Sequence, residues 1–408
     1  MKKKTILQIN SVINSGSTGR IAEEIGEVAI EHGWNSFIAY SRNEAFSESE
    51  KIKIGNNMSI KWHGLMTRFF DRHGLASRSA TRQLITEIDK IQPDVIHLHN
   101  IHGYYLNYKL LFEYLKSAAI PVVWTLHDCW AFTGHCPYFS FIKCDKWKTF
   151  CTCCQQQQQY PASLFFDRSE KNFHQKKRTF LSIENLTIVT ISEWLTKIVE
   201  QSFFMYNNII KISNGIDISL FKKAPTELVK ITQQKYGIAN KKVILGVARV
   251  WDKRKGLDDF VKLYSLLLND HQIILIGLSK KQIKKLPTGI IGVERTENIN
   301  ELISLYSVSD VFVNPSYEET FGLTTVEAMS CGTPVVVYDQ TALPETVSSD
   351  VGLVVEAGNI HAMNEAIKLI LDKGKEFYSH NCREKIKKRY DSSINYKKYI
   401  SLFDEYIR

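Results

Sequence analysis

The stretch Glu319–Glu327 reads ETFGLTTVE and places two glutamates around a Phe-Gly-Leu turn, ahead of an apolar helix and a Val-rich strand. Such a pair suggests a catalytic acid/base pair, a metal site or a clamp on a ligand. A glycosidase pair needs two facing carboxyl groups, one with a raised pKa, and the sequence supplies neither. No Asp-x-Asp sequence is present to hold a divalent ion on a diphosphate. Ionised carboxylates only accept hydrogen bonds, so the pair favours the hydroxyl groups of sugars.

A second segment, GVARVWDKRKG at 246–256, places Arg249 and Lys255 around a short loop between a strand and an amphipathic helix. Cations at the carboxyl end of a parallel strand, beside a helix N-terminus, form an anion site that suits phosphate. Solvated surface charge is the alternative. The turn of the glutamate segment adds backbone N–H donors from Phe321, Gly322 and Leu323. Together the two segments predict a clamp on a sugar, a diphosphate and a ribose.

Two N-terminal segments also carry polar groups after apolar strands. The turn SVINSGSTGR opens the first helix and offers close backbone approach at Gly16, Ser17, Thr18 and Gly19. It lacks the G-x-G-x-x-G pattern of nicotinamide dinucleotide sites, so a structural turn remains an alternative. PVVWTLHDCW at 121–130 ends a strand with His127 and Asp128. His99 belongs to IHLHNIH at 96–102, where a cleft wall is favoured over zinc.

Strand-like and helical patterns alternate along the whole chain, which predicts parallel sheets covered on both faces. A helix is expected over 18–32, and the tail from 392 should form a docked helix. The join between two such series falls in 214–227, where turn residues interrupt the pattern. The expected strands are residues 5–10, 35–41, 94–99, 121–127 and 186–191, then 241–250, 271–277, 310–316 and 334–339.

Length and charge narrow the class of protein. A chain of 408 residues predicts two domains. The net charge of +9 is spread in short runs, and no nucleic-acid-binding signature is present, so nucleic acid is not expected as a partner. No apolar run reaches the roughly 18 residues that span a bilayer, and the start turns polar too soon for a signal peptide. We therefore expect a cytoplasmic protein, at most peripheral on the inner face of the membrane.

Taken in order, ISNGIDISLF, ARVWDKRKG and ETFGLTTVEAM resemble the motifs of family 4 retaining GT-B glycosyltransferases, which include colanic-acid, O-antigen and exopolysaccharide enzymes. The resemblance covers nearly the whole chain. It implies an α/β GT-B fold, with two Rossmann-like doubly wound domains facing across a cleft. The expected domains are an acceptor-side domain over 1–220, a nucleotide-sugar domain over 221–390, and a helix over 391–408 that packs back toward the first domain.

The resemblance also implies roles for the residues of both segments. Arg249 and Lys255 would bind the donor diphosphate, Glu319 the sugar hydroxyls and Glu327 the ribose. His127 would stabilise positive charge at the anomeric carbon. Further donor contacts are expected from Asn214, Phe321, Gly322, Leu323 and the turn at 16–19. Acceptor contacts are expected from Asp128 and His99, and the alternative role for Asp128 is to orient His127.

The implied reaction moves a hexose from a UDP- or GDP-sugar to a glycan or an undecaprenyl-diphosphate-linked acceptor, with retention and without a divalent metal or other catalytic cofactor. In the family's debated scheme, the leaving phosphate takes the acceptor proton on the same face. A nucleotide-sugar epimerase or hydrolase of the same fold is one alternative, and a catalytically silent scaffold in a polysaccharide assembly complex is another.

Six of the eight cysteines lie in an insertion at 129–160, which resembles one in related exopolysaccharide glycosyltransferases. Four of its thiolates, with one Cys-x2-Cys pair, suit a structural zinc ion. Buried free thiols and a disulfide are the alternatives. The expected ligands are Cys136, Cys144, Cys151 and Cys154.

The segment 61–84 mixes cations with Trp, Leu and Phe. A solvated surface helix is one interpretation. The other is an interfacial patch that meets a lipid-linked acceptor at an anionic leaflet.

Overall fold

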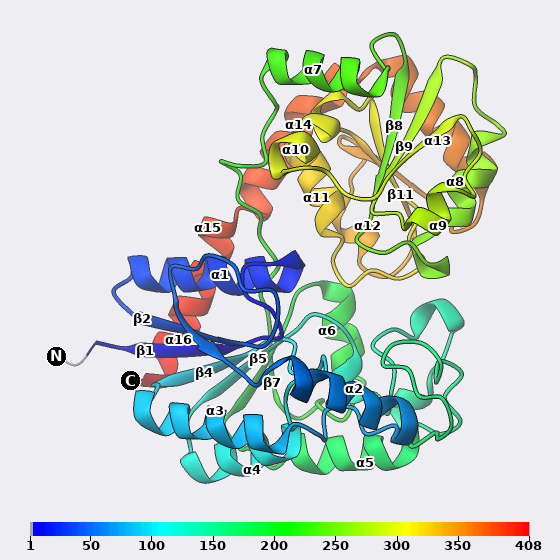
Figure 1. Cartoon of the computed structure of the whole chain (residues 1–408). Coiled ribbons are helices and arrows are strands. Elements are labelled where there is room, and N and C mark those ends of the chain that lie inside the picture. The colour runs from blue at the N-terminus through cyan, green and yellow to red at the C-terminus, as the bar shows by residue number, and fades with distance from the viewer. Residues whose placement is uncertain (1–2, 408) are drawn as a thin grey trace. The chain divides into compact units, whose positions relative to one another are not determined.

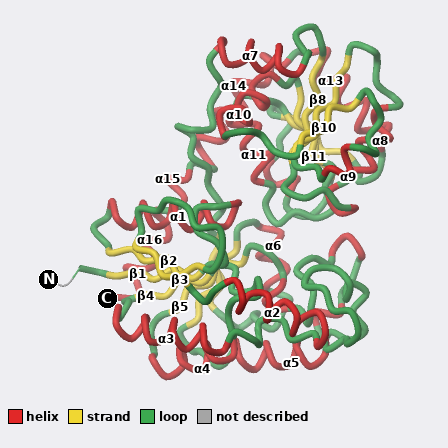
Figure 2. Tube along the Cα trace, in the orientation of Figure 1, coloured by secondary structure: helices red, strands yellow, loops and turns green. Residues whose placement is uncertain are grey.

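The computed structural model describes residues 3–407, which form two compact units (Figure 1). Unit 1 holds the chain up to Asn214 and again from Ser393, and unit 2 holds Gly215–Ser392. The break in the chain falls six residues before the predicted boundary at 220. Each unit has one parallel sheet between helices, shown as yellow strands among red helices in Figure 2.

Unit 1 contains a seven-stranded sheet in the order β3-β2-β1-β4-β5-β6-β7. Its strands are β1 (Thr5–Ile9), β2 (Asn35–Tyr40), β3 (Glu50–Lys53), β4 (Val95–Leu98), β5 (Val122–Leu126), β6 (Leu186–Thr190) and β7 (Asn208–Lys211). The central strands β1, β4, β5 and β6 are buried at every position, as expected for apolar runs in a parallel sheet covered on both faces.

The helices of unit 1 cover both faces of this sheet. They are α1 (Gly16–Glu31), α2 (Asn57–Phe70), α3 (Arg78–Ile91), α4 (Tyr108–Ala118), α5 (Ser169–Phe180), α6 (Glu193–Val199), α15 (Ser392–Asn395) and α16 (Lys397–Ile407). Helix α16 lies on the same face as α1, where Phe403 meets Trp34 and His97. On the other face, Trp124 packs against Phe112 of α4 and Phe180 of α5.

Unit 2 contains a six-stranded sheet in the order β10-β9-β8-β11-β12-β13. Its strands are β8 (Lys242–Val247), β9 (His271–Ile276), β10 (Ile290–Val293), β11 (Val311–Asn314), β12 (Val335–Tyr338) and β13 (Gly352–Val355). Its helices are α7 (Thr226–Tyr236), α8 (Leu257–Tyr264), α9 (Lys280–Ile283), α10 (Ile299–Val308), α11 (Leu323–Ser330), α12 (Leu343–Thr346), α13 (Ile360–Lys373) and α14 (Lys375–Arg389).

Both sheets have the doubly wound order, which confirms the prediction of two Rossmann-like domains. The strand order reverses between β1 and β4 in unit 1, and between β8 and β11 in unit 2. Loops at the carboxyl ends of such strand pairs are where α/β proteins bind ligands. Those two points hold most of the predicted site residues.

The insertion between β5 and α5 is largely irregular. It contains only three short 3-10 helices, namely η1 (Trp130–Phe132), η2 (Ser140–Ile142) and η3 (Lys146–Lys148). Lys176 of α5 is buried beneath it and donates to the carbonyls of Trp130 (2.7 Å) and Thr133 (3.0 Å). The Lys176 Nζ also lies 3.5 Å from the centre of the Trp130 ring. The amine of Lys176, whose pKa burial lowers to about 7, therefore holds the base of the insertion on α5.

Candidate active site

The loops after β8 and β11 form one cluster in unit 2, because these two strands are neighbours. The 3-10 turn η4 (Lys253–Lys255) ends at Gly256, whose φ is +73°. A Cβ at Gly256 would lie 2.3 Å from the Pro315 carbonyl oxygen, so only glycine permits this close approach. The Tyr317 N–H donates to the Arg254 carbonyl (2.8 Å), and Arg254 Nη1 donates to the Glu318 carbonyl (2.9 Å).

Lys255 and Glu319 form an ion pair within this cluster, and both side chains are largely buried. Burial lowers the pKa of Lys255, and it outweighs the raising effect of the Glu319 charge. Burial alone would raise the pKa of Glu319, yet the charges of Lys255 and Arg254 hold that pKa below its usual value. The predicted phosphate-binding cation and the predicted sugar-binding acid are therefore in direct contact, and Glu319 is ionised at neutral pH.

Helix α11 begins at the same edge of the sheet. Its N-cap Gly322 has φ +88°, and a Cβ there would lie 2.8 Å from a Leu343 methyl group. Phe321 is buried against the Tyr390 ring, with centroids 5.5 Å apart, so its side chain anchors the turn. The first turn of α11 is connected to Glu319 by side-chain hydrogen bonds, since Asn314 donates to Thr325 and Ser316 bonds both Asn314 and Glu319. A helix N-terminus in this position favours an anion.

Glu327 lies one turn into α11 and is buried. Its Oε2 accepts a 2.9 Å hydrogen bond from the Tyr306 hydroxyl of α10. The two glutamates of the motif thus sit in different environments: Glu319 is paired with a cation in a loop, and Glu327 is bonded to a phenol in a helix. An acid/base pair of the glycosidase type requires facing carboxyl groups, and this arrangement gives no support to it.

Arg249 and Asn214 are two further residues predicted to bind the donor. Arg249 is exposed just after β8. Asn214 is the last residue of the first segment of unit 1 and is buried. Its carbonyl accepts from Asn395 Nδ2 at 3.5 Å, and its side-chain Oδ1 has no hydrogen-bond partner among the described residues. No role in donor binding is evident for Asn214 from these contacts alone.

In unit 1, the predicted turn at 16–19 follows β1 and forms the start of α1. Asn10 fixes its base, since Asn10 Nδ2 donates to the Val12 carbonyl at 3.0 Å. Asn10 Oδ1 also accepts from the N–H of Asn100, at 3.3 Å, in the loop after β4. Gly16 has φ +64°, and Ser17 is exposed at the first turn of the helix. The turn therefore lies at the switch point of its own sheet, beside the residues that follow β4.

A chain of hydrogen bonds reaches His127 through the core of unit 1. Gln8 Nε2 donates to the Ala22 carbonyl, so Gln8 Oε1 faces His99 Nε2 as an acceptor at 3.0 Å. His99 Nε2 must then carry the proton, and His99 Nδ1 accepts from His127 Nε2 at 3.0 Å. Burial lowers the pKa of His127 to about 4 and that of His99 well below 6.5. Both rings are neutral at pH 7, with the lone pair of His127 on Nδ1.

Asp128 is buried, and its carboxylate has two hydrogen-bond partners. Its Oδ2 accepts from His102 Nε2 (2.9 Å), and its Oδ1 accepts from the Trp130 N–H (2.9 Å). His102 Nδ1 in turn contacts the Tyr160 hydroxyl at 2.9 Å. Burial would raise the pKa of Asp128, but His102 and these hydrogen bonds hold it below its usual value. Asp128 thus orients His102 and Tyr160, a role that the sequence did not indicate.

Sequence reasoning also missed Thr341, Arg254 and Gln8. The Thr341 hydroxyl bonds both the N–H and the carbonyl of Glu319, each at 2.8 Å, and so fixes that backbone. Thr341 is 22 residues away along the chain and belongs to no motif. Arg254 lies next to Lys255 in the basic run 253–255, and for these three residues this position is the one sequence signal that could have indicated a role.

The four cysteines proposed as zinc ligands line one cavity of about 20 Å³, together with His135 and Trp147. The Gly134 N–H donates to Cys151 Sγ at 3.2 Å. All eight cysteines are free thiols. Within residues 3–407, however, no three His, Cys, Asp or Glu side chains stand in a ready metal-binding arrangement. The four thiols are Cys136, Cys144, Cys151 and Cys154.

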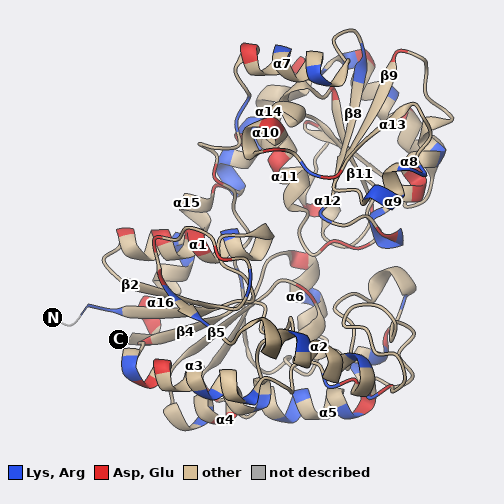
Figure 3. Cartoon of the chain, viewed as in Figure 1, with Lys and Arg blue, Asp and Glu red and all other residues tan. Residues whose placement is uncertain are grey.

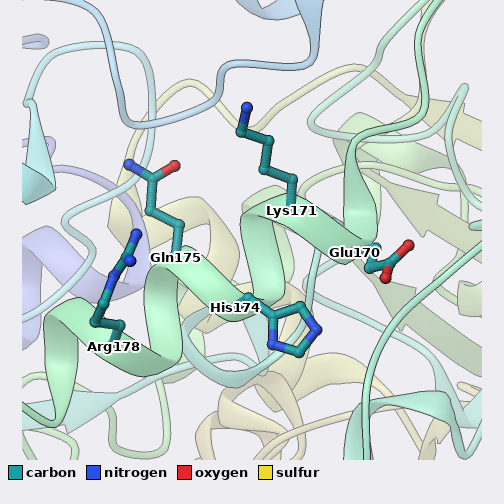
Figure 4. Close-up of a pocket in the computed structure, with 5 residues that line it drawn as sticks. All are labelled: Glu170, Lys171, His174, Gln175 and Arg178. Atoms are coloured by element: carbon teal, nitrogen blue, oxygen red, sulfur yellow. The ribbon is translucent and has the colours of Figure 1, made fainter.

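Another pocket, of about 510 Å³, lies along α5 and includes none of the predicted site residues. Figure 4 shows Lys171, Gln175 and Arg178 projecting from one side of the helix, while Glu170 and His174 point elsewhere. All five belong to one helix surface, so the pocket is a surface groove without the converging polar groups of the two strand-end clusters.

Two doubly wound domains, each with polar groups at its switch point, are the architecture of the GT-B fold. Family comparison makes this specific: residues 18–220 match Glycosyltransferase Family 4, and residues 229–389 match Glycosyl transferases group 1. The chain therefore belongs to the family 4 GT-B glycosyltransferases, as its motifs predicted.

Curated relatives of the chain include enzymes of bacterial surface polysaccharides. It is 27% identical to the putative colanic acid biosynthesis glycosyl transferase WcaC of Escherichia coli K12, over 43% of this chain and 45% of that one. It is 25% identical to the capsular polysaccharide biosynthesis glycosyltransferase CapM of Staphylococcus aureus, over 54% and 62%. A third is the N,N'-diacetylbacillosaminyl-diphospho-undecaprenol alpha-1,3-N-acetylgalactosaminyltransferase of Campylobacter jejuni, 26% identical over 49% and 56%. The aligned part spans about half the length of these relatives.

Solved structures share the fold over the full chain. Sucrose-phosphate synthase of Thermosynechococcus elongatus superposes with a TM-score of 0.71 at 17% identity, covering 99% of both chains. Anabaena Alr3699/HepE in complex with UDP-glucose gives a TM-score of 0.67 at 17% identity, covering 98% of this chain and 99% of that one. At these identities the likeness establishes the GT-B fold.

Proposed function

We propose that this protein transfers a hexose from a UDP- or GDP-sugar to a lipid-linked glycan in bacterial surface polysaccharide biosynthesis, with retention of the anomeric configuration. The observation that carries the proposal is the contact between Lys255 and Glu319 at the switch point of unit 2, beside the start of α11. It joins a cation suited to a diphosphate and an acid suited to sugar hydroxyls in one place. The complex of Anabaena HepE with UDP-glucose supports the choice of donor class.

In the proposed reaction, Lys255 and Arg249 stabilise the charge that develops on the leaving diphosphate. Preorganised charges of this kind contribute about 3–4 kcal/mol to the transition state. Glu319 accepts hydrogen bonds from the donor sugar, and Glu327 from the ribose. The neutral ring of His127 lies near the anomeric carbon, and its lone pair on Nδ1 favours positive charge there. No divalent metal takes part in this scheme.

The lipid-linked acceptor is supported by relatives, since the Campylobacter enzyme is named for a diphospho-undecaprenol substrate. We place the protein in the cytoplasm, peripheral on the inner face of the membrane. Among residues 3–407, none of the helices is both long enough and apolar enough to cross a bilayer.

The test is transfer from labelled UDP- and GDP-hexoses to undecaprenyl-diphosphate-linked glycans, without added metal. The proposal predicts a labelled lipid whose new linkage has the anomeric configuration of the donor, as read by NMR. Omitting Mg²⁺ or Mn²⁺ should leave the rate unchanged. Inversion would overturn the retaining mechanism. Free epimerised donor would favour the epimerase, and free hexose would favour the hydrolase. No turnover with any donor would favour the silent scaffold.

We also propose that Cys136, Cys144, Cys151 and Cys154 hold one structural zinc ion. Support comes from their shared cavity, which has the volume of a single small ion or water, and from the N–H bond to Cys151. Purified protein should contain one zinc per chain, and Cys151→Ser should lose it. Cys153→Ser, a change at an exposed neighbour, should retain it. If the purified protein contains no zinc and a thiol titration finds eight reactive thiols per chain, the four cysteines are free thiols instead.

A further inference from the structure

Helix α2 presents an outward face that is apolar and cationic. Surface helices normally bury their apolar side and expose a polar one. Here the buried residues are His63 and Thr67, which is the reverse pattern. The exposed residues follow the spacing i, i+3, i+4, i+7, i+10, i+11 of one helix face, and they are Met58, Lys61, Trp62, Leu65, Arg68 and Phe69.

This face continues onto the loop before α5. The Phe165 ring stacks on Phe69 with centroids 5.8 Å apart, and the Phe166 ring stacks on Phe70 at 6.3 Å. The Leu164 N–H also donates to the Arg68 carbonyl at 2.8 Å. Met58 is 79% exposed, Trp62 60% and Phe165 68%. We call this continuous surface the α2 patch, formed by the exposed face of α2 with Phe70 and residues 164–166.

The C-terminal end of the α2 patch is held firmly to the domain. Asp71 ends α2 in the left-handed conformation and is fully buried. Its carbonyl accepts from Asn172 (3.0 Å), and its carboxylate accepts from the Arg168 N–H (2.8 Å) and contacts His135 (2.8 Å). These hydrogen bonds therefore fix the position of the helix end that carries the exposed aromatic rings.

The stretch 57–86, which includes α2, exposes charge of one sign. The exposed Asp167 follows the other part of the patch, and its carboxylate accepts from the backbone N–H groups of Cys154 and Ser169. Between residues 57 and 86, the acid is Asp71, which is buried and bonded, whereas the cations are Lys61, Arg68, Arg72, Arg78 and Arg82. In Figure 3, α2 carries blue segments and no red ones. A groove of about 380 Å³ beside the patch is lined by Trp62, Met66 and Leu75 together with Arg72 and Arg78. Apolar walls with cations at the rim match an acyl chain and its anionic headgroup.

We propose that the α2 patch docks on an anionic lipid bilayer, with its aromatic side chains inserted among the acyl chains and its cations on the phosphate headgroups. Aromatic and aliphatic residues interleaved with Lys and Arg, without acids, are the composition of interfacial helices. Each cation near an anionic leaflet adds about 1 kcal/mol of attraction. This inference rests on the proposed function for its purpose, because a lipid-linked acceptor lies at the membrane surface.

The test is co-sedimentation of the full chain with vesicles of phosphatidylcholine alone or mixed with phosphatidylglycerol. The mixed vesicles should bind the protein, and high salt should weaken binding. Combined Trp62→Ser, Phe69→Ser and Phe165→Ser substitutions should reduce partitioning at least about tenfold. A matched control removes three exposed apolar residues of unit 2, Ile231→Ser, Leu268→Ser and Phe377→Ser, and should bind like the parent.

A second measurement locates the contact. Brominated lipids should quench mainly Trp62 emission, because Trp62 is 60% exposed and Trp194 is only partly exposed, whereas Trp34, Trp124, Trp130, Trp147 and Trp251 are buried. Trp62→Phe should lose most of the quenching and keep binding. Equal binding by the patch variant and the parent, or no binding by either, would overturn the proposal. A dimer that dissociates in the patch variant, without vesicle binding, would assign the surface to a second copy of the chain. Vesicle binding needs neither donor nor acceptor, so bound protein without transfer would count only against the proposed function.

Discussion

The two switch points of this molecule occupy the same place in two similar sheets but use opposite chemistry. In unit 1, Gln8 of β1 and His99 after β4 lie at the switch point, and hydrogen bonds between uncharged groups connect them to His127 at the end of the next strand, β5. In unit 2, the loops after β8 and β11 bring Lys255 and Glu319 together as ions. The same topology therefore supports a neutral site in one domain and a charged site in the other.

The difference follows from what each site is proposed to bind. A diphosphate needs fixed positive charge. Because burial disfavours the charged form of Lys255, a partner of opposite charge such as Glu319 is needed to keep this lysine ionised. A cationic centre developing on a sugar is destabilised by a nearby imidazolium and tolerates a neutral ring. Burial lowers the pKa of His127 to about 4 and supplies that neutrality, because it outweighs the negative charge of Asp128, which acts to raise the pKa.

The largest effect is expected at the charged site. Lys255→Ala should lower kcat/KM for transfer by about 100-fold to 1,000-fold, because it removes a preorganised charge from the leaving group. The measurement is steady-state transfer at saturating acceptor. Lys253→Ala, an exposed neighbour in the same 3-10 turn, is the matched control and should stay within about twofold. Similar rates in both variants would remove Lys255 from the proposed mechanism.

A smaller loss is expected at the neutral site. His127→Gln keeps a hydrogen-bond donor but not the ring, and should lower kcat by about 100-fold while the donor Kd changes little. Because the pKa of His127 is about 4, the parent's rate should not fall between pH 7 and pH 5.5 through titration of this ring. Donor binding that falls in proportion to kcat would instead make His127 a binding residue.

Acidic pH should destabilise unit 1 more than unit 2. The pKa values of His63 and His97 are about 3, and that of His127 about 4, all lowered by burial below an ordinary value of 6.5. For a depressed folded pKa, stability is complete above 6.5 and is lost as pH falls toward 4, since the unfolded state binds more protons. Each ring then costs roughly 2 kcal/mol at pH 5.

The buried histidines among residues 3–407 all lie in unit 1. Limited proteolysis at pH 5 should therefore release peptides of unit 1 before those of unit 2, whereas at pH 7 this bias should disappear. Earlier cleavage of unit 2 at pH 5 would contradict the role of burial in setting these pKa values.

The smallest effect concerns the second glutamate. Tyr306→Phe removes one hydrogen bond to Glu327 and should raise the donor KM a few-fold with kcat nearly unchanged. A 2'-deoxyribose donor should bind the parent less well than the ribose donor and lose this preference in Glu327→Gln. Tyr206→Phe, at a highly exposed tyrosine, is the control. An equal ribose preference in parent and Glu327→Gln would show that Glu327 is structural.

Much of this architecture could be predicted from the sequence. The buried central strands are continuous apolar runs, so their positions and the doubly wound class followed from alternation alone. The edge strands β3, β7, β10 and β13 were missed, because segments such as EKIK are partly exposed and lack such a run. For the site, the motif residues after β8 and β11 were recognised by type and spacing.

The remaining contacts depend on packing between distant segments. No residue near Glu319 in the sequence indicates its contact with Thr341. Likewise, no residue near His127 indicates a role for Gln8, which is 91 residues from its partner His99. Asp128 was expected beside His127 or an acceptor, and its carboxylate instead bonds His102. Sequence motifs therefore indicated which residues carry charge, while the fold decides which groups hold them in position.

Donor binding tests the central claim most directly. Thermal shift with UDP-, GDP- and dTDP-sugars, without added metal, should show one base that stabilises the parent and the Lys253→Ala control. By mass action, a ligand at 100 times its Kd adds about 2.7 kcal/mol to the stability of the protein that it binds. Lys255→Ala and Glu327→Ala should lose this shift while remaining folded. A folded parent that responds to no nucleotide sugar, or an equal shift in Lys255→Ala, would contradict the account.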